Sequence, residues 1–161
     1  MIKRRYSFFW TFLLVFLFTG RALPQTDSLR VLFVGNSYTY YNNLPHIVSL
    51  ISDSTKTKLV TTKSTAGGAR LSQHWHGERN LRTKELIKSG EYDSVIFQEQ
   101  SMGPISQPDS FRVYAKKLAT LAKENGAKPF FYMTWAREKV PQFQSELSRG
   151  YRGVASELNA G

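Results

Sequence analysis

The sequence contains no cysteine. This absence excludes disulfide bonds, cysteine-ligated zinc and a cysteine nucleophile, so the fold has to be held together by its hydrophobic core alone. Acidic residues are few, 12 against 22 lysines and arginines, and the formal net charge is +10. The basic residues form no dense run interleaved with aromatic side chains, so we expect no nucleic-acid partner.

The first 22 residues predict a secretory signal peptide. A basic segment, residues 3–5, precedes the aromatic and aliphatic residues 6–19, and Gly20 and Ala22 suit a cleavage site after Ala22. The apolar run is shorter than the roughly 20 residues that a membrane-spanning helix needs. We therefore expect an exported protein, periplasmic or secreted, with no membrane contact after cleavage. A retained membrane anchor is the alternative.

The predicted mature chain consists of a linker, residues 23–28, and one domain, residues 29–161. Four basic residues and no acidic ones precede residue 23, so the mature chain has a net charge of +6. No internal repeat or low-complexity segment divides the domain. Its length suits a single folding unit.

Short apolar runs alternate with helical patterns along this domain. Strands are predicted at residues 29–34, 58–62, 94–97 and 130–133, and helices at 44–51, from 71 or 79 to 89, at 108–125 and at 141–157. The alternation predicts an α/β fold with a parallel sheet and helices on both faces. The sequence stops in or just after the last predicted helix, where such a sheet would next supply a fifth strand. We therefore expect a domain that is incomplete at its C-terminus.

Polar or small residues follow every predicted strand, at the edge of the sheet where ligands of open α/β folds bind. They are Ser37, then Gly67 and Gly68, then Gln98, Glu99 and Gln100, and last Thr134 and Trp135. Ser37 is a candidate nucleophile, and its own N–H is a candidate donor to an oxyanion. Further donors are the N–H of Gly67 or Gly68 and the carboxamide of Gln100 or Gln98. The alternative is an ordinary strand-to-helix turn with a capping serine.

A general base for this serine is not evident. His46 falls within a predicted helix, where a surface position is the simpler interpretation. His74 and His76 have the alternate spacing that would place both rings on one face of a strand, but no third zinc ligand accompanies them. We expect no metal and no cofactor. Glu99 is either a substrate contact or a solvated loop carboxylate, and Trp135 either stacks on a sugar ring or packs against the protein.

Three blocks of the sequence together resemble the SGNH/GDSL hydrolases. Gly35-Asn36-Ser37 is similar to the first block of that family, with Asn36 where many members have Asp. Gly67-Gly68 is similar to the glycine of the second block, and the segment 98–101, Gln-Glu-Gln-Ser, stands where the third block would follow its strand. In that correspondence Gln100 takes the place of the oxyanion-hole Asn.

The resemblance implies a three-layer α/β/α, flavodoxin-like fold and a serine esterase mechanism without metal or cofactor. It also implies an Asp-x-x-His block near the C-terminus, and this chain has no histidine after His76. The sequence-based prediction is therefore a truncated SGNH esterase. Its substrate would be a small-molecule or glycan ester, such as an O-acetylated carbohydrate, and the present chain would be nearly inactive.

Two alternatives share the predicted fold. One is a non-catalytic module that binds a glycan through Glu99, Gln100 and Trp135. The other is a flavodoxin-like module that holds a phosphate at the Gly35 turn. The second is disfavoured, because neither glycine loop has a dinucleotide-binding or P-loop pattern.

Overall fold

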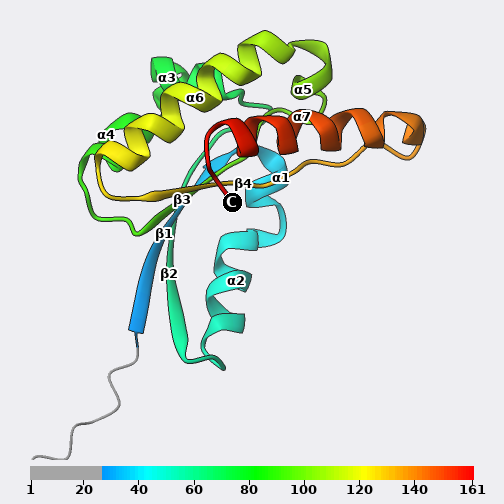
Figure 1. The fold of residues 1–161 in the computed structure, drawn as a ribbon. Helices are drawn as coiled ribbons and strands as arrows, with labels where there is room; N and C mark the ends of the chain where they lie inside the picture. Colours follow the sequence, from blue (N-terminus) through cyan, green and yellow to red (C-terminus); the bar gives the residue numbers. More distant parts are fainter. Residues whose placement is uncertain (1–26) are drawn as a thin grey trace, which may run out of the picture.

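The structure is a computed structural model that describes residues 27–161, and their four strands form one parallel sheet (Figure 1). The strands are β1 (Asp27–Gly35), β2 (Thr57–Thr65), β3 (Ser94–Phe97) and β4 (Lys128–Phe131), in the order β2-β1-β3-β4 across the sheet. The predicted α/β fold is therefore confirmed. The predicted signal peptide lies outside the described residues, and β1 includes the last two residues of the predicted linker.

Seven α-helices occur among the described residues. They are α1 (Ser37–Tyr40), α2 (Leu44–Ser52), α3 (Leu71–His76), α4 (Thr83–Lys88), α5 (Gly103–Ser106), α6 (Pro108–Glu124) and α7 (Gln144–Glu157). Short 3-10 turns lie at η1 (Tyr41–Asn43), η2 (Glu78–Asn80) and η3 (Pro141–Phe143). Within residues 27–161, no helix is long and apolar enough to cross a membrane.

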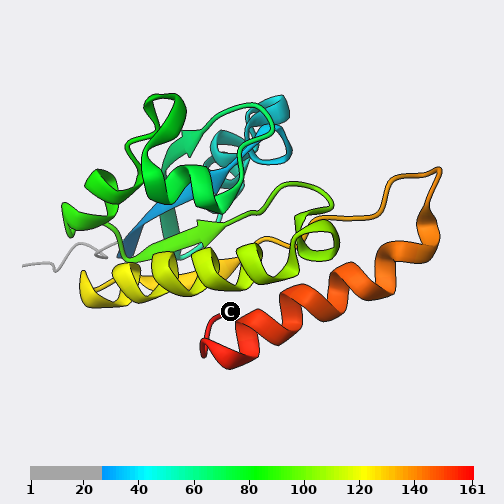
Figure 2. The same ribbon diagram turned by 90° about the horizontal axis from the view of Figure 1, so that it is seen from above.

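The helices cover both faces of the sheet. On one face α2 packs against β2, where Thr61 donates a hydrogen bond to the carbonyl of Pro45 (3.0 Å). On the opposite face α6 and α7 lie side by side (Figure 2), and α3 and α4 contact α6. The core lies under this second layer, because alternate strand residues point to the same face. Its members include Leu32, Val34, Val95, Phe97, Phe111, Leu118 and Tyr151.

Two differences between the predicted elements and the structure have a clear local description. The segment from 71 to 89 is two helices instead of one, because Gly77 ends α3 in the left-handed conformation and the backbone of Arg79 is also left-handed. The fourth strand begins and ends two residues earlier than predicted, at Lys128 and Phe131. The second difference lies at the ends of an element, where apolar patterns carry little information.

The outer edge of β4 is partly paired. After α7 the N–H of Gly161 donates to the carbonyl of Pro129 (3.2 Å), and the carbonyl of Gly161 accepts from the N–H of Phe131 (2.8 Å). These two bonds have the pattern of a parallel bridge. The C-terminal residue therefore takes the place of a neighbouring strand at this one position of the β4 edge.

Candidate active site

Ser37 is the first residue of α1, directly beyond the carboxyl end of β1. Asn36 is the N-cap of this short helix, and its side chain accepts a hydrogen bond from the N–H of Tyr38 (3.1 Å). The alternative of a capping serine is therefore wrong, because Asn36 does the capping. Within residues 27–161 the hydroxyl of Ser37 makes no hydrogen bond, and the side chain lines an open pocket. Ser37 is thus accessible at the carboxyl end of β1, and its role as a nucleophile stays a prediction.

Asn36 also joins the three loops that follow β1, β2 and β3. Its Nδ2 donates to the carbonyl of Ala69 (2.9 Å) and to the carbonyl of Glu99 (3.4 Å). The side chain is buried, so these bonds are shielded from water. The family's Asp could not make these donor contacts when ionised, because a carboxylate only accepts. An asparagine is therefore the residue that fits here, because its amide group can donate to the two backbone carbonyls that hold the first block in place.

The glycine loop after β2 lies against α1. A Cβ atom built on Gly67 would be 3.3 Å from the hydroxyl of Tyr40, and Gly68 has a positive φ of 66°. Both glycines are exposed. The N–H groups of Ser37, Gly67 and Gly68 donate no hydrogen bond to any described residue, so all three are available to a ligand. Their role in an oxyanion hole stays a prediction.

The two glutamines after β3 have different surroundings. Gln98 is fully buried, and its Oε1 accepts from the N–H of Asn36 (3.0 Å) and the hydroxyl of Thr39 (2.8 Å), while its Nε2 donates to the carbonyl of Glu99. Gln98 therefore supports the turn from inside and is not the alternate oxyanion donor that the sequence suggested. Gln100 is half-buried, and its Nε2 donates to Ser101 Oγ (3.1 Å), which leaves one amide hydrogen free.

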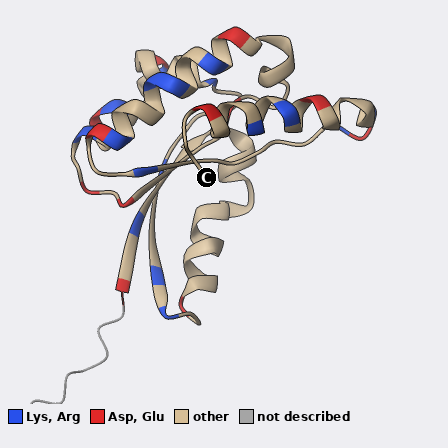
Figure 3. Ribbon diagram, in the orientation of Figure 1, with Lys and Arg blue, Asp and Glu red and all other residues tan. Residues whose placement is uncertain are grey.

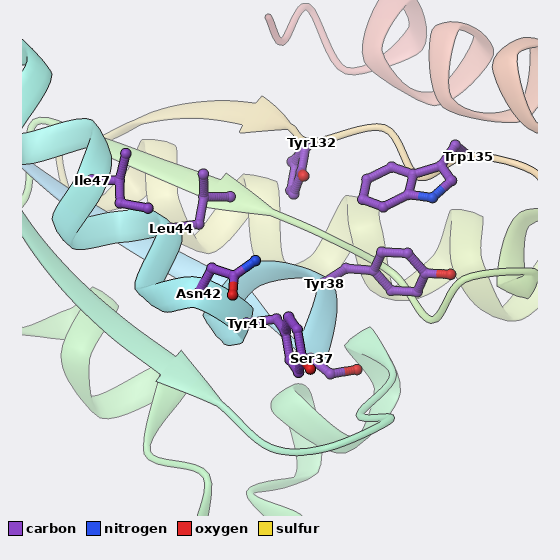
Figure 4. Close-up of a pocket in the computed structure, with 8 residues that line it drawn as sticks. All are labelled: Ser37, Tyr38, Tyr41, Asn42, Leu44, Ile47, Tyr132 and Trp135. Carbon is purple, nitrogen blue, oxygen red and sulfur yellow. The ribbon is translucent and has the colours of Figure 1, made fainter.

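The pocket that Ser37 lines has a volume of about 530 Å³. Its other walls are Tyr38, Tyr41, Asn42, Leu44, Ile47, Tyr132 and Trp135. Figure 4 shows side chains of α1, η1, α2 and the segment after β4 around one space, with the rings of Tyr38 and Trp135 next to each other. Their centroids are 4.6 Å apart at an interplanar angle of 81°. Trp135 is 47% exposed, so it both packs on Tyr38 and presents surface to the pocket.

Comparisons with known proteins agree on the fold. No family model matches the chain, and no curated protein does. Among solved structures, a candidate SGNH hydrolase from Slackia heliotrinireducens is similar, with 25% identity and a TM-score of 0.66 over 83% of this chain and 77% of that one. The esterase EstA from Pseudoalteromonas sp. is 11% identical, with a TM-score of 0.63 over 82% and 74% of the two chains. The chain has the SGNH hydrolase fold.

A third similar structure is described as a lipolytic protein of the G-D-S-L family from Desulfitobacterium hafniense, with 16% identity and a TM-score of 0.64 over 82% and 74% of the chains. The sequence resemblance to SGNH/GDSL hydrolases is thus confirmed for the fold. In SGNH terms, the first three blocks lie at the carboxyl ends of β1, β2 and β3, as predicted.

For Glu99, in the third SGNH block, the alternative of a solvated loop carboxylate is wrong because the side chain is buried, and a role as substrate contact stays a prediction. Glu99 is 3% exposed, and its oxygens accept hydrogen bonds from the N–H groups of Leu71 (3.1 Å) and Gln100 (2.8 Å). Burial raises the pKa of Glu99 above its ordinary value, while those two bonds and Arg70, 4.0 Å away, act in the opposite direction. The buried carboxylate therefore links the loops of the second and third blocks through hydrogen bonds to their backbone N–H groups.

The two histidines of α3 lie on a helix, so the shared face that their alternate spacing would give on a strand does not form. The ring of His74 is fully buried, with Nε2 3.0 Å from the carbonyl of Gly35 and Nδ1 2.6 Å from Thr83 Oγ1. Since a carbonyl only accepts, Nε2 carries the proton and Nδ1 accepts from Thr83. His76 instead contacts the hydroxyl of Tyr114 (3.0 Å). Neither ring is hydrogen-bonded to Ser37, so neither is placed as its base.

We expect His74 to make folding stability depend on pH. Burial lowers the pKa of His74 to about 4, partly offset by its bond to Gly35. Because the folded-state pKa is depressed, the contribution is fully present above the ordinary value of 6.5 and is lost as the pH falls to about 4. The loss is about 3 kcal/mol, from the size of the shift.

The measurement is urea unfolding of the wild type and His74→Gln at pH 7 and pH 4.5. The variant is less stable at pH 7, and the difference narrows on acidification because glutamine does not titrate. His46→Gln replaces an exposed histidine of α2 and serves as the control. An equal difference between wild type and His74→Gln at both pH values would contradict the prediction.

Proposed function

We propose that this site belongs to a serine ester hydrolase of the SGNH type. Ser37 Oγ attacks the ester carbonyl, and the N–H groups of Ser37 and Gly68 with the carboxamide of Gln100 receive the developing oxyanion, with Gly67 as the alternate glycine. The observation that carries the proposal is the unpaired hydroxyl of Ser37 in an open pocket at the carboxyl end of β1, together with free N–H groups on Ser37, Gly67 and Gly68. No metal or cofactor is needed for this chemistry.

The substrate that we propose is an acetyl ester of a carbohydrate. The half-exposed ring of Trp135 lines the same pocket as Ser37 and supports a sugar as ligand, because an aromatic face offers apolar contact to a sugar ring while the hydroxyl groups of the sugar remain hydrated. EstA is described as inhibited by monoethylphosphonate. The same class of reagent is a suitable probe for Ser37 here.

We expect slow turnover by the 161-residue chain. None of the three imidazoles is hydrogen-bonded to Ser37 in the described part of the chain, and the sequence has no Asp-x-x-His block. A serine without its base retains only the contribution of the oxyanion hole and binding, several orders of magnitude below an intact triad.

The test follows p-nitrophenyl acetate hydrolysis by the wild type, Ser37→Ala and the control Ser106→Ala, which changes an exposed serine of α5. Mass spectrometry of the quenched reaction locates the acetyl group. We expect slow hydrolysis and an acetyl adduct on Ser37, both lost only in Ser37→Ala. Equal labelling of lysines in all three proteins, with no adduct on Ser37, would contradict the proposal. Hydrolysis at ordinary enzyme rates would instead contradict the expectation that the chain lacks a general base. His74 and His76 would then have to be tested as the base.

The second candidate is a glycan-binding module without catalysis. The same pocket favours it, since Trp135 and the tyrosines contact a ligand whether or not Ser37 reacts. Ligand binding without any Ser37 adduct, even with a phosphonate probe, would favour this function.

A further inference from the structure

The pocket beside Ser37 carries no charge, although the chain has a net charge of +10. Residues 31–52, which contain α1, η1 and α2, include no Asp, Glu, Lys or Arg, and neither do residues 129–136. Figure 3 shows α1 and α2 without a charged residue, while charges are frequent on α6 and α7. A charged ligand would lose hydration here and gain no ion pair from the lining. The lining therefore favours an uncharged ligand.

The aromatic side chains of the pocket are held in place and remain accessible. The ring of Trp135 contacts Tyr38 edge-on at 4.6 Å, and its centroid lies 6.4 Å from that of Tyr132. Trp135 is 47% and Tyr41 is 71% exposed. Tyr41 precedes two asparagines with φ values of 52° and 53°. This uncommon backbone, which asparagine tolerates, fixes the turn at the rim of the pocket.

The polar groups of the same lining have no partner within the described chain. The hydroxyls of Tyr38, Tyr41 and Tyr132 and the carboxamide of Asn42 make no hydrogen bond to any of residues 27–161. An alkyl chain would cover these groups and leave them without partners. A ring with an apolar face and hydroxyl groups on its edge matches both kinds of surface.

We propose that the pocket lined by Trp135, Tyr38 and Tyr132 is a binding site for one uncharged pyranose ring, the alcohol half of the ester. This inference rests on the proposed function only for the orientation, with the ester carbonyl at Ser37 and the sugar ring on the aromatic side. The volume of about 530 Å³ is within the usual range of small-molecule sites. The partly buried Leu44 and the exposed Ile47 line the rest of the space.

The test measures binding without turnover. The full chain with Ser37→Ala is titrated with methyl pyranosides that carry one acetyl group, in the gluco, galacto, manno and xylo series. Hexyl acetate is the alkyl counterpart and methyl glucuronide the charged one. The readout is the indole N–H signal of Trp135 in nuclear magnetic resonance spectra, assigned by its loss in Trp135→Phe. The indole of Trp75 in α3 is the internal control.

We expect at least one acetylated pyranoside to shift the Trp135 signal and not that of Trp75. Trp135→Ala weakens its binding by about tenfold or more, since stacking and apolar contact are both lost. Val113→Ala, on α6 and also 47% exposed, leaves the affinity unchanged. Should Trp135→Ala unfold, Trp135→Phe keeps a smaller ring and is expected to bind with intermediate affinity.

Tighter binding of hexyl acetate or of the glucuronide, or no shift at Trp135 with any pyranoside, would overturn the assignment. The two proposals fail separately. Sugar binding without acylation of Ser37 would contradict the proposed hydrolase function and support the pyranose site. Acylation of Ser37 without pyranoside binding would support the hydrolase function and contradict the pyranose site.

Discussion

Replacing Glu99 with alanine is expected to lower the free energy of unfolding by roughly 3–5 kcal/mol. The change leaves the buried N–H of Leu71 and the partly buried N–H of Gln100 without an acceptor, and a buried group left in this way costs about 1–3 kcal/mol. It also removes the carboxylate that lies 4.0 Å from Arg70, and it opens a cavity beside Gly103, where a Cβ would lie 2.5 Å from Glu99 Cγ. The loops of the second and third SGNH blocks lose their common support.

Urea unfolding at pH 7 measures this effect. The control is Glu91→Ala, because Glu91 forms an exposed ion pair with Arg30 (2.7 Å), and its loss should cost no more than about 1 kcal/mol. Glu99→Gln has nearly the same shape, but one end of its amide can only donate. It therefore satisfies one of the two N–H groups and should fall between the other variants. If Glu99→Ala were as mild as Glu91→Ala, Glu99 would be left as a candidate substrate contact.

The order and type of the main elements could be predicted from the sequence. Short apolar runs such as Val31 to Val34 and Val95 to Phe97 have the composition of strands buried on both faces, and helix α6 has a regular apolar stripe that ends near Gly126. The short helices α1 and α5 have four residues each and no apolar period, so nothing in the sequence indicated them.

The sequence predicted which residues lie at the candidate site, but it did not predict which of their side chains are buried. Ser37, Gly67 and Gln100 lie at the strand ends as expected, because parallel strands bring their carboxyl ends to one edge. Gln98 and Glu99 are adjacent polar residues after a strand, which usually indicates an exposed loop. Both are buried here, because their partners are backbone groups of segments distant in sequence.

His74 and Asn36 illustrate the same limit. The contacts of His74 with Gly35 and Thr83, and those of Asn36 with Ala69 and Glu99, join residues 9 to 63 positions apart. No local pattern in a single sequence encodes such pairs. For Asn36, the only available signal was its position directly after the apolar strand β1.

Gly35 is required by the space around it and not by conformational freedom. Its φ is not in the positive range, but a Cβ atom there would lie 2.4 Å from Thr39 Oγ1 and 2.6 Å from Gln98 Oε1. Gln98 Oε1 cannot simply move, because it accepts hydrogen bonds from Asn36 and Thr39 in a fully buried site. The glycine is therefore required by the close approach of the buried glutamine beneath Ser37.

Gly35→Ala is accordingly expected to destabilise the fold by about 3–5 kcal/mol, from overpacking and from at least one lost buried hydrogen bond. Urea unfolding compares it with Gly67→Ala, where the new Cβ would lie 3.3 Å from the Tyr40 hydroxyl in an exposed loop and the cost should stay below about 1 kcal/mol. Thr39→Ala removes one of the two clashing atoms, so in the Gly35→Ala background it should cost less than it does in the wild type. A Gly35→Ala protein as stable as Gly67→Ala would show that Gln98 is free to move and does not hold the turn that positions Ser37.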